Sequence, residues 1–532
     1  MIESQFMDII FYQRSSQTSA SEGLNVLFAD LLIGATGIGE VVRVFTTRRH
    51  YNGLINVLTT NGIDLGKIEI KVEMAGNWIL RRALWGGAAM KKSKSNAAPG
   101  GGMEALRDRL IDLFARLLDF SSITLIPKML LAAILVALGL LMTPLFLAFG
   151  ALVVWRAIWR RRREIAQRLR IMRFLLILRD FKSRFETIIQ NEKLKFLEAS
   201  YRLESRRLGR IIDSNGSIKC ILFTNAFEGY LAESILRVRK VVVFPDLVTA
   251  VFPSRYPQGV LGENLHIGIA KAINNADKVI CYSNYTRDRQ LRRFFPSVSS
   301  EKISVIPQGF FVDEIGRTSS KSEVFQILRR RIPPVKHLEL VEMLVRGEGE
   351  YLIYPSVDRP HKNTITLVKA IEKLLRTEQI QVKLICTSHS ISAEVLEYIQ
   401  ERRLEREILF LPTVPIATLN FLIAHAAAVV HPSLAEGGDI FNVSRAVALE
   451  TPVIVSDILV VREMFLRYAI SETIFSKWIF DPYNLIQLVN MIRVVLAERD
   501  EFVREQNILA EVHRKYAFSD MARNYLNVIN GN

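Results

Sequence analysis

The 532-residue chain has few cysteines, and their spacing suggests neither a disulfide framework nor a metal site. Cys220, Cys281 and Cys386 lie far apart and form no CxxC pair, which favours a reducing, cytosolic compartment. The N-terminus has no basic segment followed by an apolar stretch, so we expect no signal peptide. A GxxxxGK[ST] loop is also missing, which argues against a P-loop nucleotide-binding regulator.

Acidic residues are scarce relative to basic ones. The chain has 70 Lys+Arg against 54 Asp+Glu, a formal net charge of +16 and a mean hydropathy of +0.18. It has no zinc-finger spacing, no RNA-recognition motif and no basic stripe interleaved with aromatic residues, so we expect no nucleic-acid partner. Basic side chains near anionic lipids contribute about 1 kcal/mol each. We therefore expect membrane lipids as a partner.

Alternating strand and helix patterns predict two parallel sheets with crossover helices. The expected strands of the first sheet are Asp8–Tyr12, Val42–Thr47, Ile68–Val72, Ile218–Phe223, Lys240–Phe244, Lys278–Tyr282 and Lys302–Ile306. Those of the second are Glu350–Tyr354, Val382–Cys386, Ile408–Leu411, Ala428–His431 and Val453–Val455. Expected helices include Ser21–Ile33, Tyr51–Thr60, Ala226–Val238 and Asn442–Leu449. We therefore expect two Rossmann-like domains that bind ligands at the carboxyl ends of their strands.

The α/β pattern is interrupted in the first half of the chain. Lys91–Met103 has the composition of a basic Ser/Gly/Pro-rich linker, and Glu104–Phe120 has the pattern of an amphipathic helix, either interfacial or packed on the core. Met129–Trp155 contains no charged residue and is followed by the arginines 156 and 160–163. Such a run is long enough to span a bilayer, with the arginines on the cytoplasmic side. A long helical arm is expected from about 163 to 212.

A single membrane crossing by Met129–Trp155 would place the two parts of the first sheet on opposite sides of the bilayer. Thr143-Pro144 lies near the middle of the run, where proline favours a bend. Each arm would then have about 13 residues, or roughly 20 Å of helix, against roughly 30 Å of hydrocarbon core. We therefore expect a re-entrant or monotopic hairpin at the cytoplasmic membrane face. The alternative is that these helices pair within a homo-oligomer.

The expected domain organisation follows from these patterns. The first Rossmann-like domain is formed by residues 1–75 and 216–320, with a helical membrane-associated insertion at 76–215. A second Rossmann-like domain occupies 345–515. The C-terminal helix, 516–532, is expected to pack back toward the first domain.

Several segments share the motifs of one known family. In the second domain they are Tyr354–Asn363 (YPSVDRPHKN), His431–Gly438 (HPSLAEGG), Glu450–Asp457 (ETPVIVSD) and Phe480–Tyr483 (FDPY), and the closing segment is Tyr516–Val528 (YAFSDMARNYLNV). In the first domain they are Val243–Leu247 (VFPDL), Ala276–Thr286 (ADKVICYSNYT) and Val305–Gly309 (VIPQG). Together these segments resemble glycosyltransferase family 4 (group 1), which implies that the second domain, 345–515, binds the donor. The resemblance implies the GT-B fold and a hexosyltransferase that uses a nucleotide-sugar donor with retention, without metal or cofactor. The acceptor would be a lipid-linked glycan or polysaccharide precursor at the cytosolic membrane face.

The resemblance also implies a set of site residues. Arg359 and Lys362 would clamp the donor diphosphate, because such cations can neutralise its charge. Glu436 would bind the hydroxyls of the transferred sugar, with Gly437 and Gly438 letting backbone N–H groups approach the ligand. The catalytic candidates are Glu436 and Asp246, and Ser444 and Arg445 complete the donor site. Glu22 and Gly23 are acceptor-side candidates, beside the alternative that Ser21 caps the first helix.

Three positions depart from the family pattern. Arg445 stands where the family has a ribose-binding glutamate, Glu450 replaces a glycine, and Pro245 replaces a frequent histidine before Asp246. An arginine cannot accept hydrogen bonds from ribose hydroxyls. The alternative function is therefore a catalytically degenerate GT-B scaffold that acts in a membrane complex.

Overall fold

The computed structural model describes residues 6–11, 23–73, 198–199, 201–256, 260–309, 320–331, 346, 349–388, 390–412 and 414–531. The chain divides into one compact unit of Met1–Glu73 with Ile211–Asn532 and a second of Met74–Arg210. The expected linker, amphipathic helix, apolar run and most of the helical arm lie outside the described residues. Within the described residues, no helix is both long enough and apolar enough to cross a membrane.

The first sheet has seven parallel strands in the order β3-β2-β1-β4-β5-β6-β7. The strands are β1 Phe6–Ile10, β2 Val41–Thr47, β3 Ile68–Glu73, β4 Cys220–Phe223, β5 Arg239–Phe244, β6 Lys278–Cys281 and β7 Ile303–Val305. Ile9 of β1 pairs with Leu222 of β4, so the strands before and after the interruption belong to one sheet. The expected α/β sheet is confirmed, and the strands β1, β2, β4, β5 and β6 within it are short runs buried on both faces, whereas the two edge strands β3 and β7 are partly exposed.

The second sheet has six parallel strands in the order β10-β9-β8-β11-β12-β13. They are β8 Glu350–Tyr354, β9 Val382–Thr387, β10 Ile408–Leu411, β11 Ala428–His431, β12 Val453–Ser456 and β13 Ile479–Phe480. The edge strand β13 was not expected, since its two residues are too few to show a periodic pattern. The other five strands lie where the sequence predicts them.

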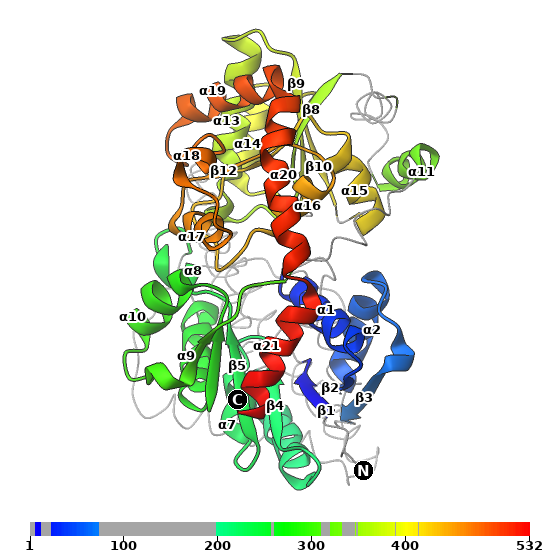
Figure 1. Ribbon diagram of the computed structural model, residues 1–532, viewed down its shortest axis with the longest axis vertical. Coiled ribbons are helices and arrows are strands. Elements are labelled where there is room, and N and C mark those ends of the chain that lie inside the picture. The colour runs from blue at the N-terminus through cyan, green and yellow to red at the C-terminus, as the bar shows by residue number, and fades with distance from the viewer. Residues whose placement is uncertain are drawn as a thin grey trace, which may run out of the picture. The chain divides into compact units, whose positions relative to one another are not determined.

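Helices cover both sheets (Figure 1). Those of the first sheet are α1 Gly23–Gly37, α2 Arg48–Thr60, η1 Leu65–Lys67, α7 Gly229–Ser234, α8 Val248–Val251, α9 Val260–Asn274, the π-helical η2 Thr286–Leu291, α10 Arg292–Phe294 and η3 Ser300–Lys302. Between the sheets in sequence lies α11 Lys321–Arg331. The second sheet is followed or flanked by η4 Pro360–Lys362, α13 Thr364–Arg376, α14 Ala393–Glu401, α15 Ile416–Ala424, α16 Phe441–Ala448, α17 Leu459–Arg467, α18 Glu472–Phe475, α19 Leu485–Ala497, α20 Arg499–Lys515 and α21 Phe518–Asn530.

Helix α7 is shorter than the predicted helix Ala226–Val238. The carboxylate of Asp213 accepts hydrogen bonds from the backbone N–H groups of Leu236, Arg237 and Val238. These amides are therefore paired with a side-chain carboxylate and not with the carbonyl groups of a continuing helix, and the chain turns into β5 instead. A contact between residues so distant in sequence leaves no mark on local periodicity.

The last helix, α21, packs against α1 at the first sheet (Figure 1). Its apolar side belongs to the core of that sheet, with Phe518, Met521, Ala522, Tyr525 and Ile529 buried there. Helices α1 and α21 approach closely at Gly34, where an added Cβ would lie 2.1 Å from the Phe518 carbonyl oxygen. The glycine is therefore required by space. Gly37, at the end of the same helix, has nothing within 4 Å of its Cβ position.

These two glycines make a matched pair. We expect Gly34→Ala to lower the free energy of unfolding by about 1–3 kcal/mol, because the methyl group would push α1 and α21 apart. Gly37→Ala should be neutral or raise it by up to about 1 kcal/mol, since alanine favours a helix and meets no neighbour. Urea unfolding of both variants is the measurement. Equal effects of the two changes would contradict the docking of α21 on α1.

Candidate functional site

The candidate site lies where the strand order of the second sheet reverses. Strands β8 and β11 are neighbours although β9 and β10 lie between them in the sequence, and ligands of open α/β sheets bind at such a switch point. The loops that follow these strands are tied together. Leu434 N–H donates to the His361 carbonyl at 2.7 Å, and the Asn363 side-chain amide donates to the Pro432 carbonyl at 3.1 Å. These hydrogen bonds hold the two loops against each other.

Lys362 of the first loop and Glu436 of the second form an ion pair. Lys362 Nζ lies 2.6 Å from Glu436 Oε1, and the two side chains are only 18% and 17% exposed. His431 Nε2 lies 3.7 Å from the same oxygen. Burial alone would raise the pKa of Glu436, but the charge of Lys362 and the neighbouring His431 and His361 lower it to about 2. The carboxylate is therefore ionised at neutral pH.

Asp246 approaches the pair from the first sheet, just after β5. Burial raises the pKa of Asp246 and the nearby negative charge of Glu436 adds to this, while a hydrogen bond from Val248 N–H and the positive charges of Lys362 and Arg359 oppose it. The structure therefore brings together the two predicted catalytic carboxyl groups. Their environments push the two pKa values in opposite directions, which suits them to different roles.

Arg359 lies at the start of η4 and is exposed. Its positive charge lowers the pKa values of Asp246 and Tyr256, although burial raises both. The Tyr256 hydroxyl is hydrogen-bonded to His361 Nδ1. Burial lowers the pKa of His361 to about 3 and that of His431 to about 4. Both histidines are therefore neutral neighbours of a positively charged loop.

Positions 437 and 438 have room only for glycine, because loops of the first sheet lie against them. A Cβ on Gly437 would lie 2.2 Å from the Pro245 carbonyl oxygen, and a Cβ on Gly438 would lie 2.7 Å from Cβ of Tyr282. We expected these glycines to admit a ligand to the backbone. That expectation stays a prediction. The structure shows that the space beside their α-carbons is filled by loops at the carboxyl ends of β5 and β6.

The remaining predicted residues lie on α16 and α1. Ser444 is buried in α16. Arg445 follows it, and its electrostatic partner is Asp30 of α1, while burial lowers its pKa. Gly23 is the first residue of α1, and Glu22 lies outside the described residues.

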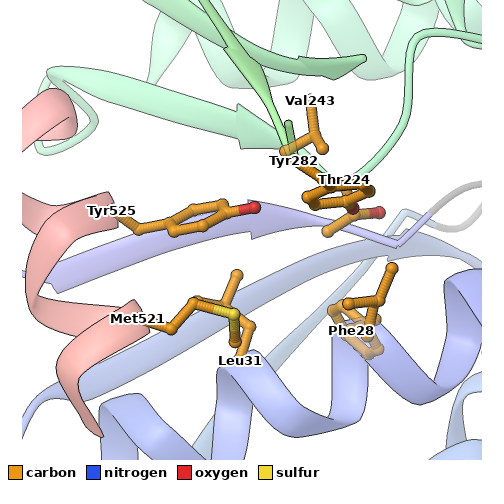
Figure 2. A pocket seen from close by; sticks show the side chains of 8 residues that line it. Phe28, Leu31, Thr224, Val243, Tyr282, Met521 and Tyr525 are labelled. Atoms are coloured by element: carbon orange, nitrogen blue, oxygen red, sulfur yellow. The ribbon is translucent and has the colours of Figure 1, made fainter. Parts of the chain in front are cut away.

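A small, mainly apolar pocket adjoins the site at the carboxyl edge of the first sheet (Figure 2). Helices α1 and α21 and the ends of β4, β5 and β6 supply its lining, which consists of Leu27, Phe28, Leu31, Thr224, Val243, Tyr282, Met521 and Tyr525. The side chain of Tyr282 is hydrogen-bonded to that of Tyr525. Because Tyr282 also contacts Gly438, it links the pocket to the loop that carries Glu436.

The sequence analysis did not single out His361, His431 or Tyr256. The two histidines stand inside the quoted motifs, directly beside Lys362 and at the end of β11, so their position was a usable signal. Tyr256 had none, since it comes close only through tertiary structure. Within the described part of the chain, no three His, Cys, Asp or Glu side chains are arranged to hold a metal ion.

Comparison with known proteins finds a sequence family that matches the part of the chain that forms the second sheet. Residues 340–514 match the sequence model of the family described as glycosyl transferases group 1. The O-antigen chain mannosyltransferase RfbU of Salmonella typhimurium is 29% identical over 125 residues. That alignment covers 24% of this chain and 35% of the relative, so the chain matches only about a third of the relative's length.

Solved structures are similar over nearly the whole chain. The Anabaena protein HepE in complex with UDP-glucose has a TM-score of 0.55 at 13% identity, with 99% of this chain and 100% of that one covered. A glycosyltransferase from Rickettsia africae has a TM-score of 0.53 at 11% identity, with 99% and 98% covered. The chain thus has the GT-B-like fold of two parallel α/β sheets, and its residues 340–514 match the group 1 glycosyl transferases.

Proposed function

We propose that this protein is a glycosyltransferase that moves a hexose from a nucleotide-sugar donor to a glycan acceptor. The observation that carries the proposal is the Lys362–Glu436 ion pair beside Asp246, at the carboxyl ends of strands from both sheets. The pair lies inside the segment that matches group 1 glycosyl transferases. HepE, which shares the fold, was solved with UDP-glucose.

The charges of the site suit the departure of a nucleoside diphosphate. The diphosphate leaves with additional negative charge, and fixed cations that await this charge stabilise the transition state. Lys362 and the exposed Arg359 are the cations at this edge of the second sheet that would meet it. Glu436, ionised and held in place by Lys362, would accept hydrogen bonds from the sugar hydroxyls. Asp246 would face the same sugar from the first sheet.

The finer assignment is also a proposal. We infer a family 4 enzyme that retains the anomeric configuration, needs no metal, and acts on a lipid-linked or polysaccharide-precursor acceptor at the cytoplasmic membrane face. In support, the similar Salmonella typhimurium protein is named an O-antigen chain mannosyltransferase. Gly23, at the start of α1, would lie on the acceptor side. The uncharged run Met129–Trp155 supports a membrane location.

The proposal is tested by binding and turnover with the full chain. Thermal unfolding is recorded with UDP- and GDP-linked hexoses, because a specific ligand raises the melting temperature in proportion to its excess over Kd. Release of the nucleoside diphosphate is then followed with a membrane lipid extract as the source of acceptor. Binding with turnover supports the transferase. Binding without turnover in any extract would favour the scaffold alternative, and no binding would contradict both the donor site and the enzyme.

Lys362→Ala probes the donor site directly. Loss of a charge-assisted contact to the diphosphate should weaken donor binding by about 1.5–3 kcal/mol, or roughly ten- to a hundredfold in Kd. Titration calorimetry with the donor found in the screen is the measurement.

Lys383→Ala is the matched control for Lys362→Ala. Lys383 is paired with Glu407, and the two side chains are 23% and 24% exposed, similar to the site pair but on β9 and beside β10. This change should leave donor Kd within about twofold of the wild type. If both lysine variants bind the donor alike, Lys362 does not hold it.

The neutral histidines predict how stability depends on pH. In the unfolded chain a histidine titrates near its ordinary pKa of about 6.5, whereas His361 and His431 titrate at about 3 and about 4 when folded. Below pH 6.5 the unfolded chain therefore binds more protons, and the stability present above this pH is lost progressively as the pH falls toward 4. Each histidine should contribute up to about 1.4 kcal/mol per pH unit.

His361→Gln should flatten this dependence by about the contribution of one group. The measurement is urea unfolding at pH 7, 6 and 5 for the wild type and the variant. An identical slope in the two proteins would show that His361 is already protonated in the folded state.

A further inference from the structure

The turn formed by residues 283–286, just after β6 of the first sheet, is hydrogen-bonded to the loop that carries Glu436. The hydroxyls of Ser283 and Thr286 lie 2.9 Å and 2.5 Å from the Gly437 carbonyl oxygen, and both donate to it. Thr286 N–H in turn donates to Ser283 Oγ at 3.0 Å. Both hydroxyl-bearing residues are completely buried. Two buried donors therefore hold one carbonyl, and the Gly437–Gly438 peptide cannot rotate without losing them.

The same turn makes a second contact with the second sheet's helices. The carboxylate of Glu463 in α17 accepts hydrogen bonds from the backbone N–H groups of Asn284 and Tyr285, at 2.6 Å and 2.7 Å. These amides begin the helical segment that continues into η2, where a negative charge is favourable. The turn 283–286 thus donates hydrogen bonds to Gly437 and is itself held by Glu463 of α17.

The far end of the same loop is held by residues at the end of α17. Asp439 is buried and accepts hydrogen bonds from Arg467 and from the Tyr468 hydroxyl. Arg467 Nη1 also lies 3.9 Å from Glu463 Oε1. A continuous set of contacts therefore runs from the turn 283–286 through Glu463 and Arg467 to Asp439. The loop is held at Gly437 from one sheet and at Asp439 from the other.

We propose that Ser283 and Thr286 are positioning residues, which set the orientation of Glu436 through the Gly437 carbonyl. The inference rests on the proposed transfer reaction, in which Glu436 contacts the donor sugar. Neither hydroxyl reaches the Lys362–Glu436 pair itself, since both donate to the backbone one residue further on. Their effect on the reaction is geometric, and small displacements of a contacting group are enough to slow a transfer step.

The test uses the full chain with Thr286→Val, which keeps the shape and removes the hydroxyl, and with the milder Ser283→Ala. Hydrogen–deuterium exchange of the peptide containing residues 432–440 reports on the loop without any need for activity. We expect faster exchange there in both variants. With the donor established above, kcat should fall about tenfold while donor KM stays within about twofold, as expected when orientation is lost in the transition state. Thr286→Ser, which keeps the hydroxyl, should restore both the slow exchange at 432–440 and the wild-type kcat.

Thr451→Val is the matched control. The Thr451 hydroxyl is also buried and donates to a backbone carbonyl, that of Ile423, at 2.9 Å, but both residues belong to the part of the chain that forms the second sheet. This change should lower the melting temperature without altering exchange at 432–440 or kcat. If Thr286→Val and Thr451→Val lower only the melting temperature, the inference is wrong. If the wild type turns over no donor, the proposed function fails, and the exchange experiment still decides whether the turn holds the loop.

Discussion

The ion pair between Lys362 and Glu436 is the contact on which the candidate site depends. A mostly buried carboxylate would normally be costly, and burial does push the pKa of Glu436 upward. The ammonium group at 2.6 Å and two neighbouring histidines outweigh this effect. The pair also joins the loop after β8 to the loop after β11. Separating these loops would leave the carboxylate buried without its counter-charge, which is strongly unfavourable.

Space imposes a second constraint. The loop after β11 passes so close to the first sheet that Gly437 and Gly438 have no room for a side chain. The resulting close approach allows Ser283 and Thr286 to reach the Gly437 carbonyl. It also brings Asp246 into the electric field of Glu436. The glycines therefore contribute to the site by permitting contact between two sheets, and the charges on each sheet then influence one another.

Much of the fold could be predicted because most of the strands are parallel and buried on both faces. In the sequence such strands are continuous apolar runs of about four to eight residues between polar loops. The edge strand Ile479–Phe480 is too short for this approach. The end of α7 was missed because it depends on Asp213, a residue well upstream. Of the site, the loops after β8 and β11 were predicted, whereas the contribution of Tyr256 was not, because only the folded chain brings it to His361.

The sequence by itself determined the α/β class, the order of the strands along the chain and the loops that carry Arg359, Lys362 and Glu436. These features depend on local periodicity and on residue types at short spacing, which a linear chain displays directly. Tertiary structure decided which charges face one another. Whether Glu436 is ionised, whether His431 is neutral and why Gly437 carries no side chain all depend on neighbours from distant segments. Burial and Coulomb interactions act through space, so they appear only once the chain is folded.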